Sequence, residues 1–160
     1  MLPTELATRS GSYPLRRAVE ADLAAIVELL AADQLGSARD SADDLGPYAA
    51  ALRAIDTDPA QQLLVATDDA GAVVATMQLT LIPGLARRGA LRMQIEAVRV
   101  QEAHRSSGLG GAMMRWAIDD SRRRGCALVQ LTSDKSRTDA HRFYQRLGFV
   151  PSHEGFKLLL

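Results

Sequence analysis

The hexapeptide Arg105-Ser106-Ser107-Gly108-Leu109-Gly110 constrains the fold of this chain more than any other segment. It lies between an alternating apolar run over residues 93–100 and an amphipathic run over residues 111–124, so it predicts a loop that leads from a strand into a helix. The first N–H groups of a helix have no acceptor within the helix, and glycine lets an anion approach them closely. The segment therefore favours a site for a phosphate-bearing ligand, although a plain tight turn is the alternative for so short a motif.

The neighbouring sequence narrows the chemistry of this site. The glycine spacing differs from that of a Rossmann Gly-x-Gly-x-x-Gly motif, and the Gly-Lys-Ser/Thr ending of a P-loop is missing, so hydride transfer and nucleotide hydrolysis have little support. Downstream, an apolar strand over residues 127–132 leads into a helical segment with Ala140-His141-Arg142-Phe143-Tyr144, followed by Leu147-Gly148-Phe149.

Together, the segments from Ile95 to Phe149 resemble the Gcn5-related N-acetyltransferase (GNAT) family. In that family an Arg/Gln-x-x-Gly-x-Gly/Ala loop binds the pyrophosphate of coenzyme A, and a Tyr-x-x-x-Gly-Phe element lines the thioester. The resemblance implies an α/β fold with a mixed, mostly antiparallel, twisted sheet flanked by helices, and acetyl-coenzyme A as cosubstrate.

A closer likeness covers the C-terminal half of the chain. Residues 132–144 and the pair Ser152-His153 are similar to bacterial aminoalkylphosphonate N-acetyltransferases. Arg137 departs from the wider family, in which many members have an asparagine at this place. Whether Arg137 replaces the cofactor contact of that asparagine stays open at this point.

Size and charge set bounds on the type of protein. A chain of 160 residues with 47% hydrophobic content predicts one domain over residues 13–160 after a flexible lead over residues 1–12. Its 19 basic and 19 acidic side chains cancel, which gives no support for nucleic acid or an anionic membrane as partner. With no long apolar run and no signal pattern, we expect a cytoplasmic protein.

Periodicity predicts the remaining elements. Helical spacing of apolar residues indicates helices over residues 22–35 and 45–55. Strands are expected over residues 13–19, 63–67, 73–81 and 91–100, with a final strand over residues 156–160. The turn Asp68-Asp69-Ala70-Gly71 joins two of these strands, so they should form an antiparallel hairpin.

Two side chains are candidates for the proton transfers of an acetyl transfer to an amine. The carboxylate of Glu96, on the strand before the hexapeptide, can accept the ammonium proton directly or through water, although many strand glutamates are simply solvated. The phenol of Tyr144, with an ordinary pKa of about 10, can protonate a departing thiolate whose ordinary pKa is about 8.5. The alternative for Tyr144 is a core aromatic packed among its neighbours.

Other residues are assigned to the cosubstrate. Residues 105–111, from Arg105 to Gly111, form what we call the anion cradle, and they should hold the pyrophosphate through main-chain donors. The strand at Val98 and Val100 can bond the amides of the pantetheine arm as an added strand would. Polarisation of the thioester carbonyl by an N–H near Val98 is implied by the family alone.

The remaining candidates are weaker. Cys126 is expected to be a buried structural thiol rather than an acyl-carrying nucleophile. His104, His141 and His153 lack the spacing of a zinc site, so no metal is expected. The pair Arg87-Arg88 is either a solvated turn or a contact for an anionic acceptor.

These observations favour an N-acetyltransferase in which a small primary amine attacks acetyl-coenzyme A directly in a ternary complex. Aminoalkylphosphonate is one acceptor that the closer likeness suggests. The alternatives are an acetyltransferase for protein N-termini or lysines, and a non-catalytic module that binds acyl-coenzyme A as a sensor. A homodimer is an expectation from the family alone.

Overall fold

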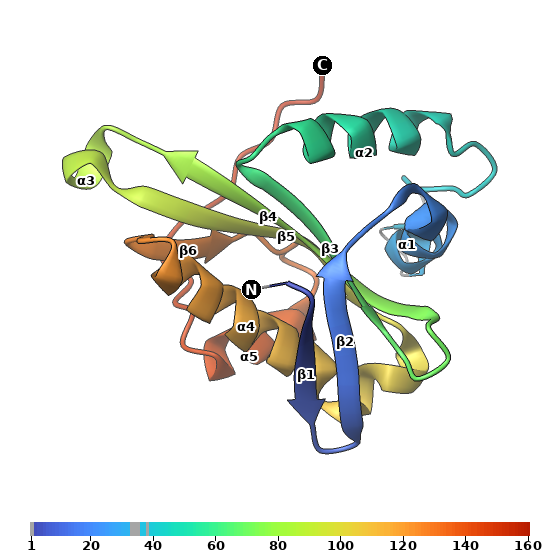
Figure 1. The fold of residues 1–160 in the computed structure, drawn as a ribbon. Helices are drawn as coiled ribbons and strands as arrows, with labels where there is room; N and C mark the ends of the chain where they lie inside the picture. The colour runs from blue at the N-terminus through green and yellow to red at the C-terminus, as the bar shows by residue number, and fades with distance from the viewer. Residues whose placement is uncertain (1, 33–35, 38) are drawn as a thin grey trace.

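A six-stranded twisted sheet organises the computed structural model, which describes residues 2–32, 36–37 and 39–160 (Figure 1). The strands pair in chain order: β1 Thr4–Thr8, β2 Gly11–Arg17, β3 Gln61–Thr67, β4 Val73–Pro83, β5 Leu91–Val100 and β6 Leu128–Leu131. Neighbours from β1 to β5 are antiparallel, and β5 and β6 are parallel. The expected mixed and mostly antiparallel sheet is therefore confirmed.

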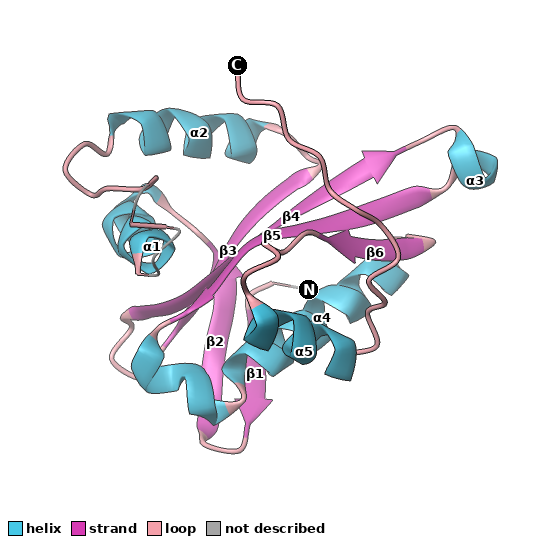
Figure 2. Cartoon of the chain, turned by 180° about the vertical axis from the view of Figure 1, so that it is seen from behind, coloured by secondary structure: helices cyan, strands magenta, loops and turns pink. Residues whose placement is uncertain are grey.

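Helices cover both faces of this sheet (Figures 1 and 2). Helices α1 (Leu23–Ala31) and α2 (Gly46–Thr57) lie on one face, and α4 (Leu109–Arg123) and α5 (Thr138–Arg146) lie on the other. Short 3-10 helices η1 (Glu20–Asp22) and η2 (Glu102–Ser107) precede α1 and α4, and α3 (Ala86–Gly89) lies at the tip of the β4–β5 hairpin. In the described part of the chain, no helix has the length and apolarity needed to cross a membrane.

The burial pattern of β3 follows from its cover on both faces. Leu64 and Ala66 belong to the core under α4, whereas Leu63 and Val65 pack in a second core with α1 and α2. Successive side chains of a strand point to opposite faces, so a strand covered on both faces is a continuous apolar run. The larger core under α4 includes Leu15, Met77, Leu79, Met93, Ile95, Leu109 and Met113.

A partly buried ion pair fixes the first helix to the sheet. The guanidinium of Arg16 on β2 donates to both oxygens of Asp22, at 2.6 and 2.9 Å, and the Val19 N–H also donates to this carboxylate at 2.8 Å. The hydrogen bonds and charge of Arg16 lower the pKa of the Asp22 carboxyl. The charge-assisted contacts thereby hold the start of α1 against β2.

The N-terminal lead expected to be irregular over residues 1–12 is instead ordered over residues 4–8. These residues form β1, in which Leu6 is buried and lies opposite Tyr13 of β2. The sequence conceals this strand because β1 is an edge strand whose other side chains are mainly polar.

The final strand expected over residues 156–160 is wrong. These residues form neither strand nor helix and belong to the pink C-terminal segment in Figure 2. Phe156 and Leu158 are 92% and 86% exposed. An apolar run forms a strand only where it can pair with the edge of a sheet and pack its side chains against a core. The helix expected over residues 22–35 ends at Ala31, and residues 33–35 of that prediction lie outside the described residues.

Candidate functional site

Strands β5 and β6 part in the middle of β5. They pair from Arg92 opposite Leu128 to Ile95 opposite Leu131, where β6 ends, while β5 continues to Val100 beside β4. Across the part of the chain that the structure describes, no strand pairs with this outer edge of residues 96–100. We call this opening the splay. Because no strand pairs with it, this edge can receive an extended chain that carries amides.

A β-bulge lies at the splay. Thr76 of β4 pairs with Arg99, and Gln78 pairs with Glu96, so Ala97 and Val98 both lie opposite Met77. Ala97 has a φ of 52°, in the left-handed region. A bulge bends its strand and leaves the backbone of the extra residue outside the ladder. The bulge thus offers main-chain groups beside Val98 that the sheet does not use.

Replacing Ala97 tests whether the left-handed bulge is needed. Ala97→Val should lower the free energy of unfolding by about 1–2 kcal/mol, because a branched side chain fits poorly at positive φ. Ala97→Gly is the matched control and should be at least as stable as the wild-type protein. Urea denaturation of the three proteins provides the measurement, and equal stability of the valine variant would contradict the prediction.

The anion cradle joins η2 to the first turn of α4. Gly108 caps the helix with a φ of 86°, a conformation that glycine adopts without strain, and a Cβ placed there would meet nothing within 4 Å. Within the helix, the N–H of Ala112 bonds to the Gly108 carbonyl at 3.0 Å, so the N–H groups of Gly110 and Gly111 lie ahead of the first helical bond. These donors and the open space in front of Gly108 suit an anion.

Two arginines add positive charge to the cradle. Arg105 is exposed, and its Nε donates to the Val100 carbonyl at 3.1 Å, so its stem is fixed at the end of β5. Arg115 lies one turn further along α4. Its Nη1 is 3.2 Å from the position that a Cβ on Gly111 would occupy. Sequence reasoning missed Arg115 as a site residue. Its only signal is the four-residue spacing from Gly111, which places both on one side of the helix.

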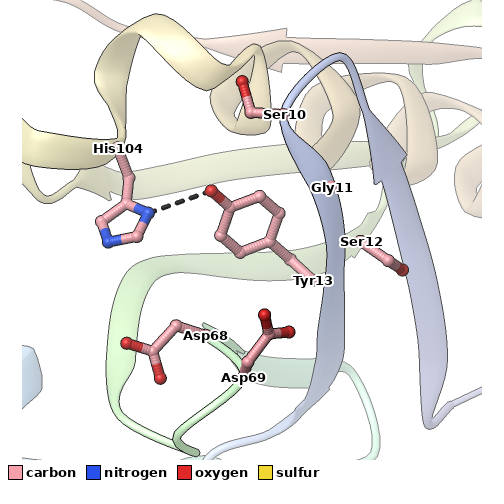
Figure 3. Close-up of a pocket in the computed structure, with 7 residues that line it drawn as sticks. All are labelled: Ser10, Gly11, Ser12, Tyr13, Asp68, Asp69 and His104. Carbon is pink, nitrogen blue, oxygen red and sulfur yellow. Dashed lines mark hydrogen bonds between the residues drawn. The ribbon is translucent and has the colours of Figure 1, made fainter.

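The loop before the cradle is held by the N-terminal hairpin. A hydrogen bond of 3.0 Å joins Tyr13 Oη of β2 to His104 Nδ1 of η2, and the two rings meet edge to face (Figure 3). The Ser107 hydroxyl donates to the His104 carbonyl at 2.7 Å and accepts the Leu109 N–H at 3.2 Å. Around this pair is a pocket of about 100 Å³ that Ser10, Gly11, Ser12, Asp68 and Asp69 also line. This chain of contacts positions the start of α4.

Helix α5 brings Tyr144 to the same region. A Cβ on Gly110 would lie 3.5 Å from Val100 Cγ2 and 3.8 Å from Phe143 Cζ, so the cradle, the end of β5 and α5 meet there. The ring of Tyr144 packs edge to face against Phe143 and Phe149, with centroids 5.3 and 6.0 Å away. Burial raises the pKa of the Tyr144 phenol, while the charges of Arg137 and Arg99 act to lower it. The phenol therefore remains protonated at neutral pH and can donate a proton.

Glu96 lies where the strands part. It follows the last β5–β6 pair and precedes Ala97 of the bulge, and its side chain is exposed. The neighbouring Ile95 and Val98 belong to the core under α4, so Glu96 points to the face of β5 that α1 covers. The two candidate catalytic residues thus come from the strand and the helix that flank the splay.

The residues present suit a phosphate ester with an amide-containing arm. Besides the cradle and the free edge of β5, the Ser133 hydroxyl oxygen is buried without a hydrogen-bond partner among the described residues, just beyond the end of β6. A buried polar atom of this kind favours a ligand or water as its partner. Val98 and Val100 pack their side chains into the core, and their carbonyls accept hydrogen bonds from Arg99 Nη1 and Arg105 Nε.

Other residues considered from the sequence lie elsewhere. Arg87 and Arg88 are exposed at α3, the hairpin tip at the end of β5 opposite the splay (Figure 1). Cys126 is half-buried after Gly125, and burial raises the pKa of its thiol, which is the opposite of nucleophile activation. Among the described residues, the structure brings together no group of three His, Cys, Asp or Glu side chains that could hold a metal ion.

Comparison with curated proteins finds two partial relatives. The chain is 35% identical over 63 residues to an aminoalkylphosphonate N-acetyltransferase of Salmonella typhimurium, covering 39% of this chain and 41% of the relative. It is 34% identical over 79 residues to a glucosamine 6-phosphate N-acetyltransferase of Trypanosoma brucei brucei, and this match covers 49% of this chain and 52% of the relative. The matched segments span about half the length of these relatives or less.

Solved structures match over most of the chain. A transcriptional regulator from Bacillus halodurans C-125 has 40% sequence identity and a TM-score of 0.88, covering 92% of this chain and 99% of that one. An acetyltransferase from Trypanosoma brucei has 29% sequence identity and a TM-score of 0.72, and the match again covers 92% of this chain and 99% of that one. The sequence profile of the Acetyltransferase (GNAT) family matches residues 23–149, which include the splay, the cradle and α5. The chain belongs to the GNAT family of acetyltransferases.

Proposed function

We propose that this protein transfers the acetyl group of acetyl-coenzyme A to the primary amine of a small molecule, by direct attack in a ternary complex. The observation that carries the proposal is the meeting of the anion cradle, the end of the unpaired edge of β5, and α5, the helix that carries Tyr144, at one place. A cosubstrate with a pyrophosphate, two amides and a thioester requires these three features in that order.

The chain's own groups account for binding of the cosubstrate. The first turn of α4, with Arg105 and Arg115 beside it, receives the pyrophosphate. The free edge of residues 96–100 pairs with the amides of the pantetheine arm. A main-chain N–H at the bulge, beside Val98, polarises the thioester carbonyl.

The proton transfers are assigned to Glu96 and Tyr144. Glu96 accepts a proton from the ammonium, directly or through water, which leaves a neutral amine to attack the carbonyl carbon. As the C–N bond forms and the C–S bond breaks, the Tyr144 phenol gives its proton to the departing thiolate. The nitrogen loses its second proton as the amide forms, and this proton restores the Tyr144 phenol, while the proton taken by Glu96 passes to solvent. The products are the acetylated amine and free coenzyme A.

The names of the relatives support a small-molecule acceptor. The two curated relatives are N-acetyltransferases named for an aminoalkylphosphonate and a sugar phosphate, both small amines. The balanced charge of this chain gives no support for a basic protein tail as acceptor. The alternative of a sensor differs in one measurable property, because a sensor binds acetyl-coenzyme A without releasing its thiol.

Binding and thiol release test the proposal in sequence. Calorimetric titration with acetyl-coenzyme A should give saturable one-to-one binding, and a panel of small primary amines should then release free coenzyme A. Binding without release by any amine would favour the sensor. An absence of binding at millimolar concentration would mean that the glycine loop is only a turn.

Glu96→Gln tests the general base. We expect kcat/KM to fall by about 100-fold at neutral pH, and by less as the pH rises and more of the amine is neutral in solution. Glu28→Gln, which alters an exposed glutamate on α1, is the matched control and should follow the wild-type profile. The measurement is kcat/KM from pH 6 to 10 for one amine. An unchanged profile in the Glu96 variant would remove the assignment.

A further inference from the structure

A row of polar side chains crosses four strands on the face of the sheet that carries Glu96. The residues on either side of each glutamine of β4, β5 and β6 pack into the core under α4, so the glutamines point to the opposite face. Gln61 shares this face with Leu63, the alternate residue of β3, which packs with α1 and α2. We call these half-buried side chains the amide row: Gln61 of β3, Gln78 and Thr80 of β4, Gln94 of β5 and Gln130 of β6.

Hydrogen bonds join the members of the amide row in two groups. Gln78 Nε2 and Thr80 Oγ1 donate to Gln61 Oε1, at 3.1 and 2.8 Å. Gln130 Nε2 donates to Gln94 Oε1 at 2.7 Å. Within the described part of the chain, Gln78 Oε1, Gln94 Nε2 and Gln130 Oε1 bond to no protein atom. The row therefore leaves a donor group and acceptor atoms for a ligand.

The candidate base lies beside the amide row. Gln78 of β4 is directly opposite Glu96 of β5, and the Cβ atoms of such cross-strand partners are about 5 Å apart. Gln94 precedes Glu96 by two residues on the same face of β5, which is about 7 Å along the strand. An amine at the Glu96 carboxylate thus places the rest of a short acceptor over Gln78 and Gln94.

The charges near the amide row offset each other. Glu96 and Arg99 lie on one face of β5 and have opposite signs, and Arg99 Nη1 donates to the Val98 carbonyl at 3.0 Å. Arg92 turns its guanidinium towards the β4–β5 hairpin, where Nη1 is 3.8 Å from the position of a Cβ on Gly84. The row itself has no charge, and the Glu96 carboxylate repels an anion placed beside it.

The unbonded atoms of the amide row favour an uncharged polar ligand. A carboxylate or phosphonate accepts hydrogen bonds only, so it would bond to Gln94 Nε2 but face the acceptor atoms of Gln78 and Gln130 with further acceptors. An alkyl group would leave all of these atoms without a partner. A carboxamide or hydroxyl both donates and accepts, which matches the row.

We propose that the amide row binds an uncharged polar group of the acceptor, so that the preferred amine carries a carboxamide or hydroxyl close to its nitrogen. The inference rests on the proposed acetyl transfer and adds the group that is recognised and the residues that select it. The names of both curated relatives contain an anionic group, a phosphonate or a phosphate. A preference for an anionic amine is therefore one outcome of the test, and it would overturn the inference.

Amines of nearly equal shape test the preference. In β-alaninamide, β-alanine and isopentylamine, the same aminoethyl chain carries a carboxamide, a carboxylate or an isopropyl group. With saturating acetyl-coenzyme A, kcat/KM is measured by thiol release and compared at equal concentrations of neutral amine. β-Alaninamide should exceed each of the other two by about 10- to 100-fold, the range expected for two or three uncharged hydrogen bonds. Equal rates, or a preference for β-alanine or isopentylamine, would overturn the inference and leave the acetyl transfer intact.

Variants identify the residues. Gln78→Leu and Gln94→Leu should each lower kcat/KM for β-alaninamide by about 5- to 10-fold and change that for isopentylamine by less than about threefold. Gln145→Leu, which alters an exposed glutamine of α5, is the matched control and should retain the wild-type preference. An equal loss for both amines would mean that the glutamines support only the fold or Glu96, and would overturn their role in selection.

A binding measurement separates this inference from the acetyl transfer. Propanamide and propanoate, which lack the amine, are titrated into isotopically labelled protein saturated with coenzyme A. Nuclear magnetic resonance follows the side-chain amide signals of Gln78 and Gln94, which the two leucine variants assign. Shifts with propanamide that are much smaller with propanoate support the site even if no amine in the panel is acetylated. No shift with either compound, or shifts at least as large with propanoate, would overturn it even where acetyl transfer is observed.

Discussion

Tyr144→Phe should lower kcat by about 10²- to 10⁴-fold while the dissociation constant of acetyl-coenzyme A stays within about threefold of the wild-type value. The variant removes only the hydroxyl, and the ring retains its edge-to-face contacts with Phe143 and Phe149. The departing thiolate then has to take its proton from water. Steady-state kinetics and calorimetric binding on the same preparation give the two quantities.

The pH profile distinguishes this role from a packing role. Because burial raises the pKa of the Tyr144 phenol, the donor remains protonated in the wild-type protein until the pH exceeds about 10, the ordinary tyrosine pKa. Turnover should therefore persist through mildly alkaline pH and decline only above it, and Tyr144→Phe should lack that decline. Tyr48→Phe, which loses a hydroxyl bonded to Asp40, is the control. Normal turnover in Tyr144→Phe would leave the residue as a core aromatic.

Gly108→Asp should weaken acetyl-coenzyme A binding by at least about 100-fold. Gly108 is the cap residue of α4 and a Cβ there would meet no atom within 4 Å, so the new carboxylate would fit beside the N–H groups proposed to hold the pyrophosphate. Two like unit charges 4 Å apart repel by about 4 kcal/mol at a dielectric typical of a protein surface. Calorimetric titration measures the loss of affinity.

Gly108→Asn separates charge from strain. Asparagine has nearly the same shape as aspartate and adopts a φ near 86° about as readily, so both variants carry similar backbone strain. The asparagine variant should bind acetyl-coenzyme A at least tenfold more tightly than the aspartate variant at low salt, and the gap should narrow at high salt. Equal, undiminished binding in both variants would mean that no phosphate lies in front of Gly108.

Most of the regular elements could be predicted because their signals are local. Strand β5 is found over the expected residues 91–100, and α2 differs from its prediction by one residue at its start and two at its end. Helix α4 begins at Leu109, before the run of residues 111–124 that predicted it, because the glycines at its start have no apolar periodicity. Residues 156–160 have the composition of a strand, but pairing depends on a partner edge that composition cannot supply.

The site was less accessible to sequence reasoning because parts of it are non-local. The cradle and Tyr144 belong to recognisable motifs, whereas an alanine at positive φ has no sequence signature, so the bulge at Ala97 could not be foreseen. Arg115 looks like an ordinary residue of the polar helix face.

The contact between Tyr13 and His104 has a thermodynamic consequence. The two residues are 91 positions apart, so the loop that precedes the cradle is held in place only when the first hairpin and the segment before α4 are folded together. A ligand of the cradle then binds the native state and has little affinity for the unfolded chain. Occupancy at 100 times the dissociation constant would add about 2.7 kcal/mol to the free energy of unfolding. The concentration of the cosubstrate would thus help to set the stability of the whole fold as well as the rate of its reaction.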